Sequence, residues 1–221
     1  GLYSTEGRSR TGTVREDHIT ETALALFAEA RTQWTPWLRS SLALRRDEIS
    51  ADVTALGGQY NMGNGGSVRG GQTSPKLGLV LGPFNLAGST EFYANWGHGF
   101  HSNDVRGATI AVDPQTGEAA ERVPALVKGR GSEVGWRFQP SEALTVTAAL
   151  WQLRLDSELV YVGDAGSTEP GRASRRRGIE ATLRWQVDPH WRVEADAAIS
   201  RARFRGLAPE GEGNFIDNAP Q

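Results

Sequence analysis

Apolar and polar residues alternate along several stretches of the chain, with a repeat of two residues. The clearest run covers residues 176–187. Its apolar positions are Ile179, Ala181, Leu183, Trp185 and Val187, and the positions between them are Glu180, Thr182, Arg184 and Gln186. Because successive side chains of a β-strand point to opposite faces, this pattern predicts a strand with one apolar and one polar face.

The same alternation predicts about eight strands. They are expected at about 19–33, 37–47, 76–82, 90–99, 127–138, from 144 onward, 176–187 and 191–204. In the sixth, the apolar positions shift from Leu144, Val146, Ala148 and Leu150 to Trp151, Leu153 and Leu155. Such a shift predicts a β-bulge near Trp151.

The connections between these strands are of two kinds. Four are short and carry a proline, at Pro36, Pro83, Pro140 and Pro189. Large aromatic residues gather near them, namely Trp34, Trp37, Phe84, Trp136, Phe138, Trp185 and Trp191. The other connections are long, polar and rich in glycine. Short turns at one end, long loops at the other and an aromatic girdle are typical of an outer-membrane β-barrel. We therefore expect an all-β, antiparallel, up-and-down transmembrane β-barrel with short periplasmic turns and long extracellular loops.

Composition narrows the choice of protein class. The 221 residues include no cysteine, which excludes disulfides and thiolate metal sites. The formal net charge is −2, so no electrostatic argument favours nucleic acid as a partner. No stretch approaches the roughly 18 apolar residues of a helical membrane span, but a barrel strand needs only one apolar face.

The ends of the chain predict a section of a larger barrel. Both termini are expected on the side of the long loops. A complete barrel that inserts from the periplasm usually has both of its ends on the periplasmic side instead. Residues 217–221 also read as polar loop rather than as a closing strand. We therefore interpret residues 1–221 as an interior part of a larger barrel, about eight strands of it, without a plug domain.

The two faces of the strands receive different environments in this interpretation. Leu77, Leu79, Leu81, Ile179, Ala181 and Leu183 are expected to face lipid. The expected lumen-facing or plug-facing residues are Glu91, Asn95, Glu133, Arg137, Glu180, Arg184, Glu194 and Asp196. Both signs of charge occur in this set, which suits a hydrated lumen packed against a polar plug better than an ion-selective pore. The alternative is a soluble β-protein with solvated polar faces.

One hairpin allows its register to be predicted. If residues 188–190 form a three-residue loop, Val187 lies opposite Trp191. Arg184 then faces Glu194, and Thr182 faces Asp196, on the lumen side. Trp185 meets Val193 on the lipid side. A slip by one residue would place Arg184 in hydrocarbon, so burial fixes this register more strongly than the ion pair does.

Few residues suggest chemistry. His98, His101, Asn103, Asp104 and Arg106 lie close together near an outer strand end and are candidate substrate-binding residues; the alternative is an ordinary polar loop. The run 175–177 consists of three arginines, which are either strand-end charges or contacts to lipopolysaccharide phosphates or an anionic chelate. No nucleophile, base and acid can be assembled, so we expect neither an enzyme nor a cofactor or metal site.

The segment EFYANWGHGFHSNDVRG (91–107) resembles a strand-and-loop sequence of TonB-dependent outer-membrane receptors. The stretches SPKLGLVLGPF (74–84), GSEVGWRFQP (131–140) and SRRRGIEATLRWQV (174–187) are similar to neighbouring strands of that family. The resemblance covers roughly residues 16–204. It implies a plugged barrel in the outer membrane of a Gram-negative bacterium that takes up a scarce nutrient.

The resemblance also implies partners and a ligand. The partners are the receptor's own plug domain, the TonB energising complex, outer-membrane lipid and lipopolysaccharide. The ligand is a small molecule such as a ferric siderophore, cobalamin, another metal chelate or a glycan. The plug and the TonB box are not found in these residues. A passive channel or a structural barrel without energised transport is the alternative function.

Overall fold

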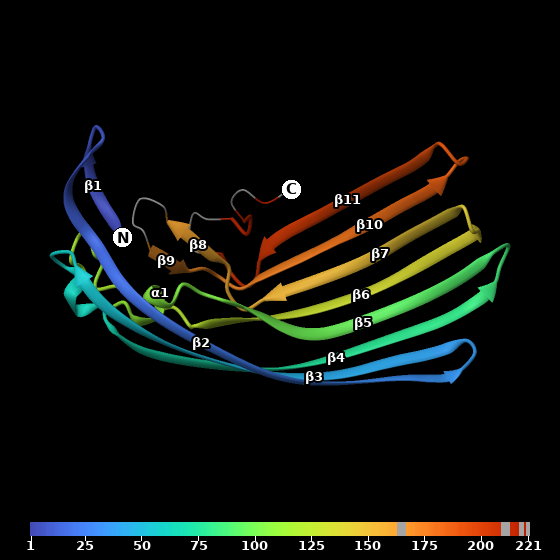
Figure 1. Ribbon diagram of the computed structural model, residues 1–221, viewed down its shortest axis with the longest axis horizontal. Coiled ribbons are helices and arrows are strands. Elements are labelled where there is room, and N and C mark those ends of the chain that lie inside the picture. The colour runs from blue at the N-terminus through green and yellow to red at the C-terminus, as the bar shows by residue number, and fades with distance from the viewer. Residues whose placement is uncertain (163–166, 209–212, 217–218, 220–221) are drawn as a thin grey trace.

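The computed structural model describes residues 1–162, 167–208, 213–216 and 219. Nine strands form one curved antiparallel sheet, in the order β1-β2-β3-β4-β5-β6-β7-β10-β11 (Figure 1). Each strand pairs with the next one along the chain up to β7. β7 then pairs with β10, because β8 and β9 form a separate hairpin between them in sequence. The strands on the N-terminal side are β1 (Leu2–Glu6), β2 (Ser9–Thr35), β3 (Leu38–Gly57), β4 (Gly66–Asn85) and β5 (Ser89–Ser102). Those that follow are β6 (Leu126–Ser141), β7 (Leu144–Leu155), β8 (Leu159–Val162), β9 (Ser167–Pro170), β10 (Ser174–Gln186) and β11 (Arg192–Phe204).

The strand ends confirm the two kinds of connection. All four short turns lie at one end of the sheet, and the long loops and the N-terminal strand lie at the other (Figure 1). Pro36 and Pro189 lie in these turns, whereas Pro83 and Pro140 lie near the ends of β4 and β6, which continue to Asn85 and Ser141 before the chain turns. The long loops carry the short helices η1 (Asn61–Gly63) and α1 (Val105–Thr109). In the part of the chain that the structure describes, no helix is long and apolar enough to cross a membrane.

Several strands are longer than the alternation predicts. β2 begins at Ser9, β3 continues to Gly57, β4 begins at Gly66, and β1 is an additional strand. These segments extend toward the long-loop end. In β2 and β4 they carry polar residues on both faces, so the period of two disappears there although the backbone remains paired. In β3 the alternation continues, but its apolar residues Ala51 and Val53 lie on the concave side, where they pack against α1.

The predicted β-bulge near Trp151 is wrong. β7 pairs with β6 through Leu155 and with β10 along its whole length, and no register shift occurs near Trp151. The change in apolar positions has another cause: Trp151 lies opposite Glu133, so Trp151, Leu153 and Leu155 are on the polar face of the sheet. The Trp151 ring lies against Gly178, where an added Cβ would be 2.8 Å from it.

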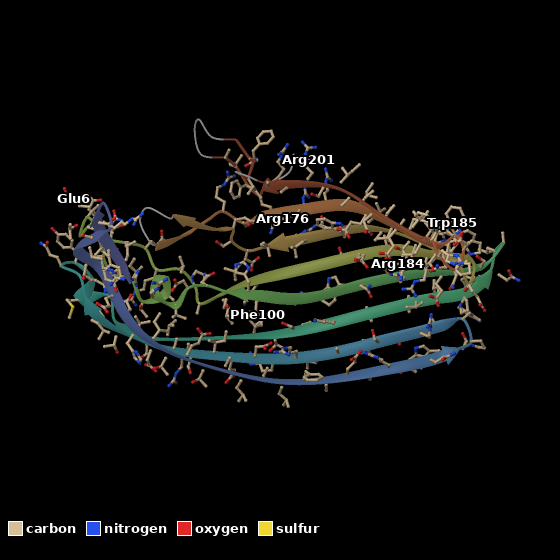
Figure 2. All side chains as sticks on the ribbon, turned by 45° about the horizontal axis from the view of Figure 1, so that its top comes forward. Glu6, Phe100, Arg176, Arg184, Trp185 and Arg201 are labelled. Carbon is tan, nitrogen blue, oxygen red and sulfur yellow. The ribbon has the colours of Figure 1, made fainter. Side chains whose placement is uncertain are left out.

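The predicted register of the last hairpin is confirmed. Arg184 pairs with Glu194, Thr182 with Asp196, and Trp185 with Val193. The backbone N–H of Val187 donates to the carbonyl of Trp191 at 2.9 Å. Arg184 and Trp185 lie close to the short-turn end, whereas Arg176 and Arg201 lie toward the long loops (Figure 2).

An ion pair between non-adjacent strands identifies the concave face. Arg39 of β3 contacts Glu91 of β5 across β4, which separates the two strands. Side chains of strands two apart converge only on the inside of a curved sheet. The polar face is therefore the concave one, and the apolar face, which includes the exposed side chains of Leu77, Leu150 and Ile179, is convex.

A small apolar core lies at the long-loop end. Ala51 and Val53 of β3 are buried against Val105 of α1, with Val68 of β4 packed beside them. Elsewhere the sheet is a single layer, as a barrel wall is.

Candidate functional site

The expected lumen-facing residues share the concave face of the sheet. The backbone register places Glu91 opposite Arg137 and Asn95 opposite Glu133 on β5 and β6. It places Arg184 opposite Glu194 on β10 and β11. Glu180 of β10 lies four residues before Arg184 and therefore on the same face. The structure therefore brings the whole set together on one surface, across strands β5 to β11.

The charges on this surface are locally balanced. The Glu91 carboxylate accepts from Arg137 at 3.2 Å and also pairs with Arg39. Asn95 donates to Glu133 at 3.3 Å. Glu194 lies 3.8 Å from Arg184 and 2.5 Å from Arg192. A surface with both signs of charge offers hydrogen-bond donors and acceptors without a strong net field.

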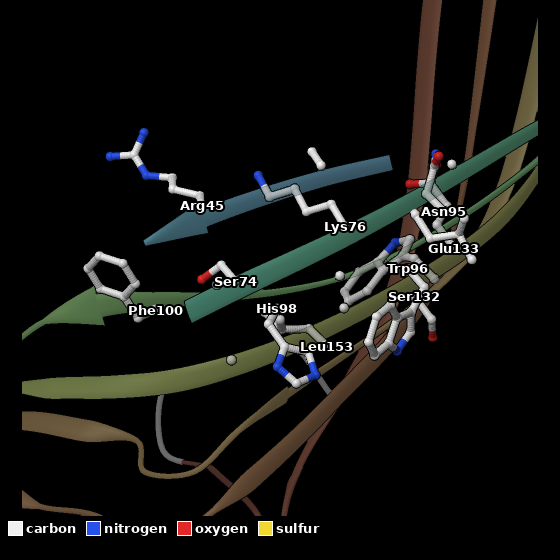
Figure 3. A pocket seen from close by; sticks show the side chains of 18 of the residues that line it. Arg45, Ser74, Lys76, Asn95, Trp96, His98, Phe100, Ser132, Glu133 and Leu153 are labelled. Atoms are coloured by element: carbon white, nitrogen blue, oxygen red, sulfur yellow. The ribbon is translucent and has the colours of Figure 1, made fainter. Parts of the chain in front are cut away.

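The concave face holds an open pocket of about 1070 Å³ (Figure 3). Its charged lining residues are Glu29, Arg45, Lys76, Glu133 and Glu180, and the aromatic residues Trp151 and Phe27 also contribute. Arg45 and Lys76 project from neighbouring strands at one side of the pocket. This combination can bind a polar ligand of either charge through several side chains.

Glycines form the floor of this pocket. Gly97 lies directly opposite Gly131, and Gly99 opposite Gly129, on β5 and β6. A Cβ atom added at Gly99 or Gly131 would meet nothing within 4 Å, so packing does not require glycine at these two positions. The missing side chains leave backbone exposed and hollow out the wall. Sequence reasoning did not single out these residues, although glycine at every second position of both strands was a usable signal.

The predicted substrate-binding residues are divided between two faces and a loop. His98 and His101 are an odd number of residues apart in one regular strand, so they point to opposite faces of β5. His98 accepts from Nε of Arg130 at 3.1 Å and contacts the Trp96 ring. His101 lines the concave pocket. His98 also borders this pocket (Figure 3), but its position in the regular ladder is on the opposite face of β5 from His101.

The remaining three predicted residues shape the loop after β5. Asn103 is buried and donates through its side chain to the carbonyl of Pro124. The Asp104 carboxylate caps α1 by accepting from the backbone N–H of Arg106 at 2.9 Å, and it also pairs with the Arg106 guanidinium. Burial raises the pKa of Asp104, but the hydrogen bonds and the charge of Arg106 outweigh burial and leave the pKa below its usual value.

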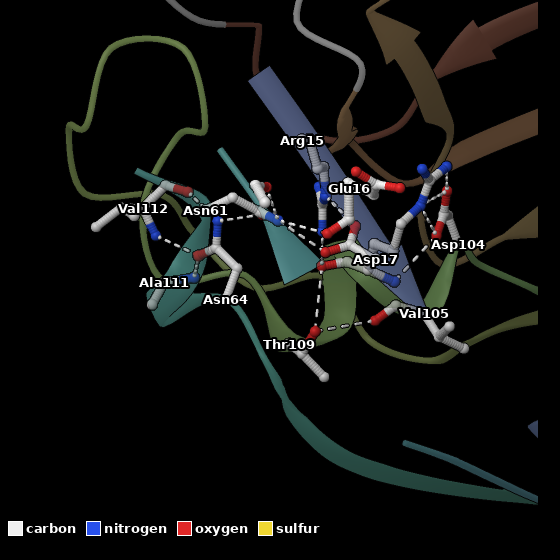
Figure 4. A network of polar contacts seen from close by, with 12 residues as sticks. Arg15, Glu16, Asp17, Asn61, Asn64, Asp104, Val105, Thr109, Ala111 and Val112 are labelled. Atoms are coloured by element: carbon white, nitrogen blue, oxygen red, sulfur yellow. Dashed lines mark hydrogen bonds and ion pairs between the residues drawn. The ribbon is translucent and has the colours of Figure 1, made fainter. Parts of the chain in front are cut away.

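A buried polar network joins this loop to the loop after β3 (Figure 4). Arg15 of β2 donates from Nε to Asp17 at 2.6 Å and from a terminal nitrogen to the carbonyl of Arg106 at 3.3 Å. Asn61 donates to Asp17 at 2.8 Å. Asn64 accepts from the backbone N–H groups of Ala111 and Val112 at 2.8 and 3.0 Å.

This network fixes both long loops against β2. Its buried side chains are satisfied mainly by one another and by backbone, which is what a structural role requires. Among the described residues, no group of three or more His, Cys, Asp or Glu could hold a metal ion.

Comparison with known proteins agrees with this architecture. Residues 2–221 match the family described as TonB dependent receptor-like, beta-barrel. The comparison with curated proteins found no match.

Solved structures with the same fold include three receptors or transporters. The alcaligin outer-membrane receptor FauA from Bordetella pertussis has a TM-score of 0.62 and 18% identity, over 91% of this chain and 32% of that one. The ferric citrate transporter FecA has a TM-score of 0.66 and 18% identity, over 95% and 31%. The copper transporter OprC has a TM-score of 0.64 and 16% identity, over 84% and 30%. The chain thus spans about a third of the length of these proteins.

These findings define the class of protein as a transmembrane β-barrel wall of the outer membrane of Gram-negative bacteria. The chain belongs to the family of TonB-dependent receptor β-barrels. Its family and structural neighbours are receptors and transporters rather than enzymes.

Proposed function

We propose that residues 1–221 form one section of the barrel of a larger receptor, which takes up a scarce nutrient with energy from the TonB complex. The remaining strands and a plug domain complete the receptor, and the plug packs against the concave face. The nutrient is a siderophore, cobalamin, another metal chelate or a glycan. The length of the solved structures with this fold supports the larger barrel, since the chain covers 32% of FauA.

The glycine-floored pocket is the observation that carries this proposal. A porin needs an open channel through the barrel and no recess in its wall. A recess of about 1070 Å³ lined by residues of both charges provides a surface that a plug or a ligand can fit. Glu91, Asn95, Glu133, Arg137, Glu180, Arg184, Glu194 and Asp196 are the proposed plug-facing set. The presence of both signs of charge in this set matches a polar protein surface better than a stream of ions of one sign.

Ligand contacts are proposed at the outer end of the same face. Both histidines border the pocket, and His101 is the candidate whose position in β5 is on the concave face. Asn103, Asp104 and Arg106 act there by holding the loop in shape, and His98 has its contacts on the convex side. This arrangement makes His101 the first residue to test for ligand binding.

The alternative is a passive channel or structural barrel. Conductance of the intact receptor in a planar lipid bilayer distinguishes the two functions without knowledge of the ligand. A plugged receptor should be closed at rest and open only when the plug is unfolded with urea. A stable open conductance without urea would contradict the plugged-receptor proposal.

Uptake then tests energy coupling. Cells that express the intact receptor are given radiolabelled ferric citrate, a ferric catecholate, cobalamin or a maltodextrin, with and without a functional TonB complex. Uptake that saturates and requires TonB supports the proposal. Gly131→Leu, which fills the pocket floor, should reduce uptake, while Gly12→Leu, at another glycine with nothing within 4 Å of an added Cβ, should not.

A further inference from the structure

Six arginines lie together on the convex face of the sheet, toward its long-loop end. The register pairs Arg130 with Arg154 across β6 and β7, and Arg154 with Arg175 across β7 and β10. Arg175 in turn pairs with Arg203, and Arg177 pairs with Arg201, across β10 and β11. Directly opposite residues have Cβ atoms about 4.5–5.5 Å apart, so these side chains form one surface. The basic patch comprises Arg130, Arg154, Arg175, Arg177, Arg201 and Arg203.

The basic patch continues the lipid-facing columns of the sheet. On β10, Arg175 and Arg177 precede the convex apolar residue Ile179, and on β11 Arg201 and Arg203 follow Ile199. Arg175 is separated from Trp185 by ten residues of β10, about 33 Å at ~3.3 Å per residue. A strand tilt of ~40° makes this about 25 Å along the membrane normal, which is the height of the apolar band of an outer-membrane barrel. With Trp185 at the periplasmic interface, the patch lies at the outer one.

Four arginines of this patch, Arg154, Arg175, Arg177 and Arg201, are not balanced by carboxylates of the described residues. On the concave face, Arg176 pairs with Glu158 at 2.9 Å and Arg137 with Glu91 at 3.2 Å. On the convex face, the guanidinium groups of Arg154, Arg175, Arg177 and Arg201 form no ion pair or hydrogen bond with any described residue. Arg130 donates to His98, and Arg203 stacks over the Phe215 ring at 3.5 Å.

One edge of the patch is a hollow. It has a volume of about 250 Å³ and is lined by His98, Lys128, Gly129, Arg130, Arg154, Asp156 and Arg205. Asp156 is the single carboxylate in this lining. The Nε atom of Arg154 is buried, and it has no hydrogen-bond acceptor among the described residues. The hollow therefore presents several hydrogen-bond donors and only one carboxylate that could accept from them.

Like charges placed directly opposite one another destabilise a sheet, and four such arginine pairs occur here. An anion between them removes that repulsion. Guanidinium groups pair with phosphate through two parallel hydrogen bonds, which favours phosphate over a simple halide. Because the apolar residues Ile179 and Ile199 adjoin the patch, an anion that carries acyl chains gains contacts that a free phosphate lacks.

We propose that the basic patch binds the phosphate groups of lipid A, the phosphorylated glycolipid of the outer leaflet, with acyl chains along the adjoining apolar surface. Arg154 and Arg175 occupy its centre, and the hollow beside Arg154 receives one phosphate. The proposal rests on the membrane position of this barrel family and is independent of the nutrient that is transported.

Native mass spectrometry of the intact receptor in detergent tests this assignment. Purified receptor is titrated with bisphosphoryl lipid A and, separately, with the same lipid after removal of both phosphates. Wild-type protein should retain one bisphosphoryl lipid A. Arg154→Gln combined with Arg175→Gln should weaken retention about tenfold or more, because charge-assisted hydrogen bonds are lost. The lipid without phosphates should bind weakly to both proteins.

Three controls keep the test decisive. Arg46→Gln combined with Arg69→Gln removes two arginines from the same convex face outside the patch and should leave retention unchanged. Arg154→Lys combined with Arg175→Lys keeps the charges and should retain more lipid A than the glutamine variant. Heat-dependent migration on a gel establishes that each variant is folded. If the Arg154→Gln, Arg175→Gln variant is not folded, Arg177→Gln combined with Arg201→Gln replaces it.

Equal retention by wild type and the glutamine variant would overturn the proposal. Equal loss in the Arg46 and Arg69 control would show non-specific charge and would also overturn it. Inorganic phosphate is added at the ionic strength of a sodium chloride control. Because the site pairs with phosphate, inorganic phosphate should displace lipid A more than the chloride does, but only when it is in large excess over the lipid. Complete displacement by phosphate at the concentration of the lipid would show that the acyl chains contribute nothing, and the lipid assignment would be wrong.

Discussion

Arg39 and Glu91 form an ion pair across an intervening strand, with Arg137 donating to the same carboxylate from the other side at 3.2 Å. The Glu91 side chain is only 16% exposed, while those of Arg39 and Arg137 are 42% and 54% exposed. Glu91 thus links β3, β5 and β6 on the concave face. Solvent around both arginines screens the interaction, so its contribution to stability is moderate.

Glu91→Gln should therefore lower the free energy of unfolding of the intact receptor by about 1–2 kcal/mol, since both ion pairs are lost while the size of the side chain is kept. Urea unfolding in detergent, followed by tryptophan fluorescence, measures this. Glu29→Gln removes an ion pair between exposed neighbours of β2 and is the matched control, with no measurable change expected because solvent screens that pair. Similar losses in both variants would contradict the linking role of Glu91.

Two glycines of β6 should respond differently to substitution. Gly135 lies under the Tyr93 ring, and an added Cβ would be 2.1 Å from Cζ of Tyr93, whereas at Gly131 it would meet nothing within 4 Å. Gly135→Ala should therefore cost about 1–2 kcal/mol as the ring is displaced. Gly131→Ala should change stability by less than about 0.5 kcal/mol. The same unfolding measurement compares them, and a larger loss at Gly131 would show that the pocket floor is structural.

Asn64 should be essential to the fold of the loop after β5. Its side chain accepts from Ala111 and Val112 and donates to the carbonyl of Val112 at 2.9 Å. Asn64→Ala leaves these buried backbone groups without partners, a local cost of about 2–4 kcal/mol. Limited proteolysis should then cut residues 110–120 much faster. Asn95→Ala, which removes a single exposed hydrogen bond, should not change the cleavage rate.

The Asp104 cap should make the same loop sensitive to acid. Its folded-state pKa is below the usual value, so the ionised group stabilises the loop above the unfolded-state pKa of ~3.9. That stability is lost as the pH falls through the lower, folded-state pKa. Hydrogen exchange, corrected for the intrinsic effect of pH, should show residues 105–109 protected at pH 6 and progressively less protected below about pH 4.

Asp104→Asn removes the titrating group and provides the control for the acid effect. The variant should show reduced protection of residues 105–109 already at neutral pH, with little further change in acid. An unaltered pH dependence in the variant would assign the acid effect to another group.

The orientation of the barrel predicts which sites can be labelled from outside the cell. Gly63→Cys lies in a long loop with space for a side chain, while Ser141→Cys and His190→Cys lie at the short turns. A membrane-impermeant maleimide applied to intact cells should label the first and neither of the others. All three should react after the outer membrane is permeabilised. Labelling of Ser141→Cys in intact cells would reverse the orientation.

The membrane-crossing part of the fold could be predicted from the sequence because lipid and lumen impose opposite requirements on neighbouring residues. The pairing of Arg184 with Glu194 follows from that rule and a three-residue turn. The rule does not apply to the outer extensions of β2 and β4, which are polar on both faces, and in β3 the apolar residues change to the concave face, where Ala51 and Val53 pack against α1. The alternation also misleads at Trp151, because a tryptophan on the lumen side, where its ring covers Gly178, interrupts the apolar pattern in the same way as a β-bulge does.

The candidate site was predicted less well, for a physical reason. Short spacing in sequence placed His98 and His101 together, but alternation along a strand separates them onto two faces. Asp104 and Arg106 pair with each other, which local sequence does not reveal. The basic patch depends on arginines from four strands, and only the run 175–177 could be noticed before the register was known.

The facing glycines of β5 and β6 also bear on the mechanics of the wall. Resistance of a β-sheet to bending comes partly from Cβ atoms that crowd on the inner side of the curve. At Gly97 opposite Gly131, and at Gly99 opposite Gly129, those atoms are missing from the concave side. The wall can therefore flex along this line at lower cost than on either side of it, and the cross-section of the barrel can become elliptical here without a break in backbone pairing.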